Sequence, residues 1–181
     1  MKKVITPNPI QPSLQKGHGL IFFFIFLVFL DMAIKSYVFT HIPMMSWKDP
    51  YYPYGGVGIF RDLFGCTLSI NHIANRGAAW GLFSSYSDFL FYMRLMIILV
   101  LVAYLYFLKD KSKKFAFLLV LAGAIGNVLD YFIYGHVIDY FYLQMGEYGF
   151  PLFNLADSLI CFGIFLLFIL SFGKKKEIHA H

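Results

Sequence analysis

The chain has 181 residues, of which 59% are apolar, 20% aromatic and only 14% charged. So few polar residues cannot cover a soluble globule, and the composition excludes an ordinary soluble domain in favour of an integral membrane protein. The formal net charge is +5. The lysines stand in short blocks beside apolar segments and form no folded basic surface, which argues against nucleic-acid binding.

The chain begins with a polar stretch that leads into the first long apolar segment. Residues 1–18 are polar and contain prolines, so we expect a flexible cytoplasmic lead there. The apolar segment covers about 19–39, and a membrane-crossing helix needs ~20 such residues. It has no small-residue cleavage site, so we predict a retained span and reject a cleaved signal peptide. Asp31 and Lys35 lie four residues apart on one face of this helix, which predicts a structural ion pair.

Residues 40–87 are the largest part of the chain outside the apolar segments. This insert opens with prolines and the Gly55-Gly56 pair, which are typical of loops. Residues 66–73 then alternate well enough for a strand. We therefore predict a small outer-face β-sheet on the membrane surface, between the first two of the predicted spans.

Three more apolar segments follow, near 88–108, 115–134 and 151–172. They predict an all-α integral membrane protein with four transmembrane helices in one domain, residues 19–172. Residues 135–150 separate the last two spans, and we expect an outer loop there with an aromatic interfacial belt. Residues 173–181 are expected to form a basic cytoplasmic tail. The two cysteines lie in different places, Cys66 in the outer insert and Cys161 deep in the fourth span, which predicts neither a disulfide nor a metal site.

The distribution of basic residues predicts the orientation of the four spans. If the chain crosses four times, ten lysines fall on one side, and only Lys48, Arg61 and Arg76 lie in the loops of the other. The positive-inside rule then places both termini in the cytoplasm. The ten are Lys2, Lys3, Lys16, Lys109, Lys111, Lys113, Lys114, Lys174, Lys175 and Lys176.

The ionisable residues inside the spans lie at one depth. Counted at ~1.5 Å per helical residue, all five fall in the outer half of a ~30 Å apolar core, with Asp139 just above them. Such groups are costly in a membrane, so a functional site is their default interpretation. Asp130 could join the Asp31–Lys35 pair, with Arg94 or Lys35 as its counter-charge. Arg94 could instead reach outward to the interface. The five are Asp31, Lys35, Arg94, Asp130 and Asp157.

Asp139 and Asp157 differ from the other charges because no basic residue is near them in sequence. Two carboxylates at short range cannot both ionise comfortably, so one should hold a proton while the other stays anionic. Such a pair can activate water and protonate a leaving amine. The alternative is a helix N-cap role for Asp157 and a surface-loop role for Asp139, although Asn154 is the better cap candidate. The chain has no His-Glu-x-x-His and no Gly-x-Ser-x-Gly motif, so a carboxylate pair is the hydrolytic chemistry that remains.

Two non-hydrolytic functions compete with this interpretation. A small ion-coupled transporter could use the buried charges as a proton relay, and a non-catalytic assembly factor could use them to hold helices together. The charges share one depth and do not run across the membrane, and the four spans contain no repeat. Both features argue against alternating access.

Five sequence blocks in order make the chain similar to the bacterial lipoprotein signal peptidases (signal peptidase II), from about residue 20 to residue 172. The resemblance implies a membrane aspartic endopeptidase with catalytic Asp139 and Asp157. It would remove the signal peptide before a diacylglyceryl-modified cysteine of a prolipoprotein. The blocks are Asp31-Met32-Ala33-Ile34-Lys35, Asn75-Arg76-Gly77-Ala78-Ala79-Trp80, Gly123-Ala124-Ile125-Gly126-Asn127-Val128-Leu129-Asp130, Gly135-His136-Val137-Ile138-Asp139 and Phe153-Asn154-Leu155-Ala156-Asp157-Ser158.

The resemblance carries further expectations. It implies the bacterial cytoplasmic (inner) membrane, a site near the outer (periplasmic) face, contact with membrane lipid, no cofactor or metal, and inhibition by globomycin. The chain departs from the family at Tyr131, where arginine is usual, at Trp80 for phenylalanine and at Ile34 for a small hydroxyl residue. Substrate-binding or site-supporting roles are implied for Asn75, Gly77, Asn127, Asp130 and Asn154.

Overall fold

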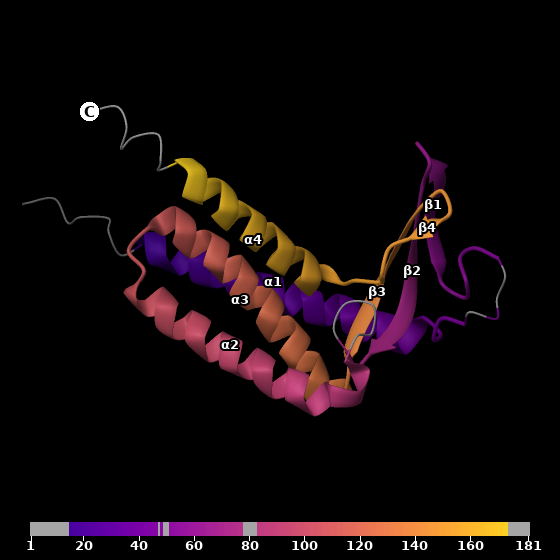
Figure 1. Cartoon of the computed structure of the whole chain (residues 1–181), viewed down its shortest axis with the longest axis horizontal. Helices are drawn as coiled ribbons and strands as arrows, with labels where there is room; N and C mark the ends of the chain where they lie inside the picture. The colour runs from indigo at the N-terminus through magenta and orange to yellow at the C-terminus, as the bar shows by residue number, and fades with distance from the viewer. Residues whose placement is uncertain (1–14, 47, 49–50, 78–82, 174–181) are drawn as a thin grey trace, which may run out of the picture.

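The computed structural model describes residues 15–46, 48, 51–77 and 83–173 of the chain. Most of the expected lead, most of the expected basic tail and Trp80 lie outside these ranges. The described part contains four long helices and one small sheet. Figure 1 shows the helices running alongside one another, with the sheet projecting from one end of the bundle.

Each long helix has a window that is long and apolar enough to cross a membrane. The prediction of four membrane-crossing helices with a small sheet is therefore confirmed. The first three helices begin up to four residues before the expected positions and end within two residues of them. The helices are α1 (Gln15–His41), α2 (Ser87–Phe107), α3 (Lys111–Tyr134) and α4 (Leu155–Gly173).

Helix α3 is the centre of the bundle. Half of its most apolar window is buried inside the protein, against 11–17% for the other three helices, so these present most of their surface outward. A Cβ atom added at Gly123 would collide with the carbonyl oxygen of Ala156 in α4, and one at Gly163 would lie 2.7 Å from the carbonyl oxygen of Ala116 in α3. Small residues thus let the backbones of α3 and α4 approach closely, as is usual between membrane helices.

Local sequence sets both ends of α3. The side chain of Asp110 accepts hydrogen bonds from the backbone N–H groups of Ser112 and Lys113 at the start of the helix. At the other end, Gly135 has a φ of 74°, a left-handed conformation that glycine adopts without steric cost. Gly135 ends the helix and leads the chain directly into the sheet.

The sheet has four antiparallel strands in the order β1-β2-β3-β4. In the long β2–β3 pairing, Ile73 is opposite Asp139 and Asn75 is opposite Val137. This register puts Asn75 near Asp139. The strands are β1 (Val57–Leu63), β2 (Cys66–Asn75), β3 (Val137–Met145) and β4 (Tyr148–Gly149), and a short 3-10 helix η2 (Ser84–Tyr86) precedes α2.

Residues 135–150 were expected to form an outer loop, but most of them form β3 and β4. The first four residues of β3 are all buried, so the strand has no alternation of apolar and polar side chains. A strand covered on both faces reads as a continuous apolar run. That run was interpreted as an interfacial belt for this reason.

Strand β3 is anchored to the end of α1 by a cluster of buried apolar side chains. Ile138 and Tyr140 of β3 are fully buried against Val38 and Ile42. Burying each such side chain is worth roughly 1.5–3 kcal/mol, so this cluster fixes the sheet to the bundle. Asp139 lies between these two anchoring residues in the sequence of β3, so packing fixes the backbone on either side of it.

The start of α4 is later than the expected residue 151. Phe153 exchanges backbone hydrogen bonds with Phe141 of β3, and this pairing keeps the preceding residues extended. The helix begins at Leu155. The start of α4 is therefore fixed beside the middle of β3.

Candidate active site

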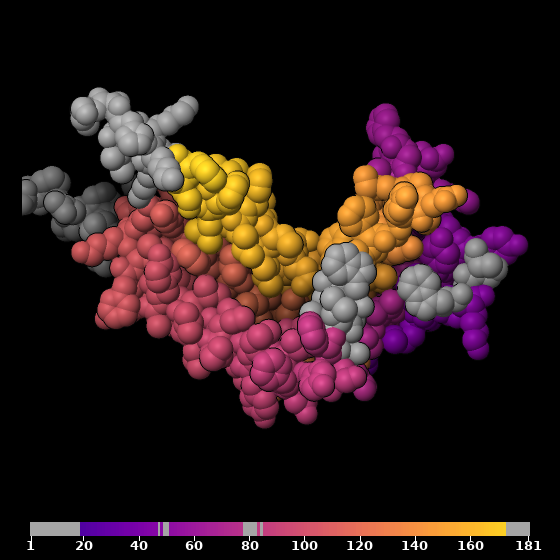
Figure 2. Space-filling view, in the orientation of Figure 1, coloured from indigo at the N-terminus to yellow at the C-terminus, as the bar shows by residue number. Residues whose placement is uncertain are grey.

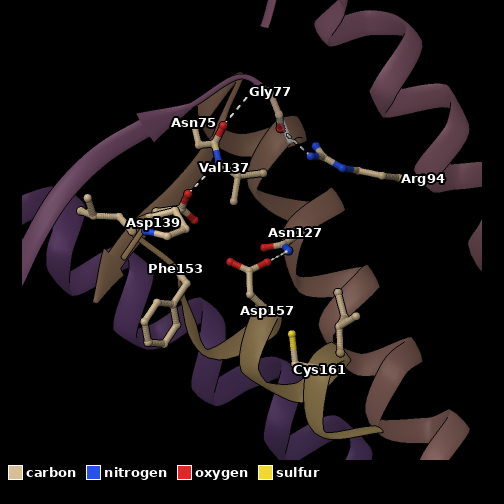
Figure 3. A pocket seen from close by; sticks show the side chains of 12 residues that line it. Asn75, Gly77, Arg94, Asn127, Val137, Asp139, Phe153, Asp157 and Cys161 are labelled. Atoms are coloured by element: carbon tan, nitrogen blue, oxygen red, sulfur yellow. Dashed lines mark hydrogen bonds between the residues drawn. The ribbon is translucent and has the colours of Figure 1, made fainter. Parts of the chain in front are cut away.

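Asp139 on β3 and Asp157 in the first turn of α4 line the same pocket, which has a volume of about 300 Å³. Figure 3 shows both side chains turned toward it, with Asn75, Asn127 and Arg94 around them. We call Asp139 and Asp157 the aspartate pair. The pocket is lined by Asn75, Gly77, Arg94, Asn127, Val137, Asp139, Pro151, Leu152, Phe153, Asp157, Ile160 and Cys161.

Asp139 is almost completely buried, with 2% of its surface exposed, and is not the surface-loop residue of the alternative interpretation. Asn75 donates to its Oδ2 atom at 2.7 Å, and Asn154 donates to its Oδ1 atom at 2.8 Å. Burial, and next the nearby charge of Asp157, raise the pKa of Asp139 to about 7, although the two amide donors act in the opposite direction. Asp139 therefore retains a proton to a higher pH than an exposed aspartate does.

Asp157 takes part in a reciprocal cap at the start of α4. Its backbone N–H donates to Oδ1 of Asn154 at 2.8 Å, and its Oδ2 accepts the backbone N–H of Asn154 at 3.1 Å. Asn154 is thus the N-cap residue, as the sequence favoured. The capping role that we considered for Asp157 uses only Oδ2. Its Oδ1 atom accepts a hydrogen bond from Asn127 at 2.7 Å and lines the pocket.

Asn154 connects the two members of the aspartate pair. Its oxygen caps the helix at Asp157, while its Nδ2 group donates to Asp139 and also to Oδ1 of Asn127 at 3.1 Å. Asn154 is fully buried. A single carboxamide therefore fixes the position of one aspartate relative to the other.

Lys35 determines which way the side chain of Asn127 points. The ammonium group of Lys35 donates to Oδ1 of Asn127 at 3.1 Å. Because an ammonium group can only donate, the oxygen of Asn127 must face Lys35 and its NH₂ group must face Asp157. Lys35 thus acts on the pocket through Asn127, without touching either member of the aspartate pair.

Lys35 also forms ion pairs with Asp31 at 2.7 Å and with Asp130 at 2.8 Å. We call Asp31, Lys35 and Asp130 the charge cluster; all three are completely buried. With Asn127, the two carboxylates use the three N–H donors of the ammonium group. Of the two roles considered for Arg94, counter-charge of Asp130 is excluded, because Asp130 pairs with Lys35.

The charge cluster also holds the backbone next to each member of the aspartate pair. Oδ1 of Asp31 accepts the backbone N–H of Ala156 at 3.0 Å, and Oδ2 of Asp130 accepts that of Ile138 at 3.1 Å. Ala156 directly precedes Asp157, and Ile138 directly precedes Asp139. The sequence predicted a structural ion pair between Asp31 and Lys35. The backbone contacts of the charge cluster indicate that it supports the pocket.

A second set of contacts reaches Asp139 from α2. The guanidinium group of Arg94 donates to the carbonyl oxygen of Gly77 at 2.8 Å, and the N–H of Gly77 donates to Oδ1 of Asn75 at 2.9 Å. Asn75 then presents its Nδ2 group to Asp139. Asn75 and Gly77 therefore reach the pocket together, as part of one turn that follows β2.

Two further residues, Cys161 and Tyr131, were singled out in the sequence. Cys161 was expected deep in the fourth span, but it lines the pocket one turn beyond Asp157, and the i, i+4 spacing was the signal available for this. Tyr131, in the position of the usual family arginine, donates its hydroxyl hydrogen to Oδ1 of Asp88 at 2.6 Å and stacks on Phe91. Tyr131 does not line the pocket.

Comparison with known proteins agrees with this architecture. A solved bacterial membrane enzyme superposes with a TM-score of 0.74 at 27% identity, covering 91% of this chain and 93% of its own. A second has a TM-score of 0.66 at 30% identity and covers 85% of this chain and 92% of its own.

Sequence relatives cover different lengths of the chain. The lipoprotein signal peptidase of Chlamydia felis is 43% identical over 158 residues, 84% of this chain and 92% of the relative. That of Chlamydia pneumoniae is 46% identical over 104 residues, 56% of this chain and 62% of the relative. The profile of the family described as signal peptidase (SPase) II matches residues 23–173, from the first turns of α1 to the end of α4. The chain belongs to the signal peptidase II family.

Proposed function

We propose that this protein is a membrane aspartic endopeptidase that removes the signal peptide from prolipoproteins carrying a diacylglyceryl-modified cysteine. The observation that carries the proposal is the aspartate pair. Asp139 and Asp157 come from different elements, line one pocket and each accept two hydrogen bonds that fix their orientation. Membership of the signal peptidase II family supports this substrate class.

The two carboxyl groups can divide the work of hydrolysis between them. With the pKa of Asp139 raised, the pair can share one proton, and we assign this proton to Asp139. Asp157 takes a proton from water as the water oxygen attacks the carbonyl carbon, and Asp139 gives its proton to the carbonyl oxygen. When the resulting diol collapses, Asp139 takes back the proton of one hydroxyl as the C=O bond forms. The C–N bond breaks, and Asp157 gives its proton to the leaving amine. No cofactor is needed for these transfers.

The position of the pocket suits a substrate that arrives through the bilayer. The pocket lies where α4 begins and the sheet joins the bundle, and Figure 2 shows the surface hollowed between α4 and the sheet. Exposed Phe162 and Phe165 on α4 present apolar surface to lipid. A signal helix and its lipid could therefore approach within the membrane while the bond to be cut enters the pocket at its surface.

The proposed orientation places the pocket at the outer face of the bacterial cytoplasmic membrane. Four lysines lie where α2 connects to α3, one in the link and three in the first turn of α3, and would face the cytoplasm together with both termini. The sheet and the pocket lie at the opposite ends of these two helices. This is the side on which an exported prolipoprotein becomes available.

The charge cluster argues against the ion-coupled transporter. The ammonium group of Lys35 has three N–H donors, and its contacts to Asp31, Asp130 and Asn127 occupy all of them. A proton relay needs a group that can change partners. The cluster instead has fixed partners, and its two carboxylates accept hydrogen bonds from the backbone beside the aspartate pair.

The proposal is tested by incubating the detergent-purified protein with a lipidated prolipoprotein. Wild type should release the signal peptide. Asp139→Asn and Asp157→Asn should each abolish release, because an amide cannot accept the proton from water. Both variants should remain folded. Asp62→Asn is the matched control, since Asp62 is exposed on β1 outside the pocket and should keep full activity. Full turnover by either pocket variant would remove that aspartate from the mechanism.

Inhibitors provide a second test of the same mechanism. Globomycin and a peptide with a hydroxyl at the position of the tetrahedral carbon should compete with substrate, because both would occupy the pocket beside the aspartate pair. Chelators should leave the rate unchanged, since the two carboxyl groups supply both the proton acceptor and the proton donor. Activity that a chelator abolishes and zinc restores would overturn the proposal.

A further inference from the structure

Arg94 is the cationic side chain of the pocket within the part of the chain that the structure describes. It lies seven residues after the first residue of α2, about 10 Å along the helix axis. A charged group inside a membrane span is costly, so its presence there calls for a function. Figure 3 shows its side chain extending from α2 toward Gly77 at the edge of the pocket.

One contact with the protein leaves most of the guanidinium group unused. Arginine has five N–H donors in a planar fork. In the described residues, a single hydrogen bond is found, from Nη2 to the carbonyl oxygen of Gly77 at 2.8 Å, and no carboxylate lies within ion-pair distance. The contact with Gly77 fixes the direction of the fork. The remaining donors are available to a group that enters the pocket.

Two other polar side chains, those of Tyr131 and Lys35, already have partners within the protein. The hydroxyl of Tyr131 is bonded to Asp88, and its ring stacks on Phe91 with 4.6 Å between ring centroids. Lys35 is enclosed by the charge cluster and Asn127. Arg94 is thus the cation placed to meet a substrate oxygen.

We infer that Arg94 contacts the substrate, donating from its free N–H groups to the carbonyl oxygen of the bond that is cleaved. This inference rests on the proposed peptidase function. As the water oxygen attacks, negative charge develops on that carbonyl oxygen, and a fixed cationic donor stabilises the charge in the transition state. The proton from Asp139 then neutralises the oxygen, so Arg94 adds to the work of the aspartate pair without replacing either member.

The first experiment compares Arg94→Gln, Arg94→Lys and the control Arg61→Gln in detergent. Arg61→Gln also removes one positive charge, but Arg61 is exposed on β1 and lies outside the pocket. Arg94→Gln should lower kcat/KM about 100-fold, mostly through kcat, because oxyanion donors act in the transition state. Arg94→Lys keeps the charge but not the fork and should lie between wild type and Arg94→Gln. The control should match wild type.

The second experiment separates substrate contact from a role in holding the Gly77 turn. Binding is measured for a peptide inhibitor with a hydroxyl at the position of the tetrahedral carbon and for the same peptide with hydrogen in its place. Arg94→Gln should weaken the hydroxyl peptide at least about tenfold and leave the hydrogen analogue unchanged. A purely structural role would weaken both equally.

Two further points keep the inference falsifiable. If Arg94→Gln does not fold, the same pair of peptides is measured with Arg94→Lys, where the hydroxyl peptide should still lose more affinity than its analogue. Equal activities of Arg94→Gln and Arg61→Gln, or equal losses for the two peptides, would overturn the role of Arg94. Absence of cleavage by wild type would instead contradict the proposed function itself.

Discussion

Asp139 and Asp157 carry the same functional group in different surroundings. Asp139 on β3 is buried, whereas Asp157 is partly buried in the first turn of α4. The pKa of Asp139 rises to about 7 because of burial and of the nearby Asp157. The buried carboxyl group of Asp139 therefore keeps its proton to a higher pH than an exposed aspartate does.

This shift predicts how stability depends on pH. An aspartate in an unfolded chain ionises near ~4, so between about pH 4 and about pH 7 the folded state binds a proton at Asp139 that the unfolded state does not. The stability from this proton is fully present below about pH 4 and is lost as the pH rises through about 7. The melting temperature of wild type in detergent should therefore fall between about pH 5 and about pH 8 by more than that of Asp139→Asn.

The charge cluster is present in both proteins of that comparison, so its titration cancels. An equal fall in wild type and Asp139→Asn would contradict the assignment of the proton to Asp139. Cleavage should give a bell-shaped rate profile whose two apparent pKa values belong to the pair.

At the scale of the elements, Asn154 links the start of α4 to β3. Asn154→Ala removes the helix cap and the donor to Asp139, so it should lower stability by about 1–2 kcal/mol and also lower activity. Asn154→Asp retains a carboxyl oxygen to cap the helix but cannot donate to Asp139. It should lose activity and gain no thermal stability over Asn154→Ala, because it places another carboxylate against Asp139 in a fully buried position. Equal activity of Asn154→Asp and wild type would show that the donor is dispensable.

The charge cluster joins α1 to α3 and makes a second prediction at this scale. Lys35→Met leaves both Asp31 and Asp130 buried without a counter-charge and should cost about 3–5 kcal/mol of stability or more. Asp31→Asn leaves Lys35 paired with Asp130 and should cost less. Thermal unfolding in detergent ranks the two variants, and a larger loss for Asp31→Asn would contradict this arrangement of charges.

Helices and strands that depend on local sequence could be predicted, whereas those that depend on contacts between distant residues could not. The length of an apolar run determines a membrane helix, so α2 was expected within one residue at each end. Strand β3 could not be found this way, because burial of both faces removes its alternation. The start of α4 was missed because backbone pairing between Phe153 and Phe141 decides it, and that pairing is absent from the local sequence.

The residues of the pocket also fall into those that local sequence identifies and those that only contacts between distant residues bring in. Asp139 and Asp157 could be singled out as carboxylates without a nearby base, and Asn154 as a cap. The contacts from Lys35 to Asn127 and from Arg94 to Gly77 join residues 92 and 17 positions apart, so no spacing rule identifies them.

At the scale of the whole molecule, the pocket exists only where all parts of the fold meet. Its polar residues come from the end of β2 and from α2, α3, β3 and α4, while α1 supports it through the charge cluster. The sheet joins the bundle at the end opposite the four lysines in the α2–α3 link and the first turn of α3. The orientation of the bundle in the membrane therefore decides on which side the substrate is cut.

Cysteine labelling tests this orientation directly. In a background with Cys66 and Cys161 replaced by serine, a single cysteine is introduced by Ser112→Cys at the start of α3 or by Glu147→Cys in the turn between β3 and β4. Both positions are exposed. A membrane-impermeant thiol reagent should label Glu147→Cys in intact cells, and Ser112→Cys only after the membrane is opened, because the lysine-rich side stays in the cytoplasm. The reverse pattern would place the aspartate pair on the cytoplasmic side, where an exported prolipoprotein could not reach it.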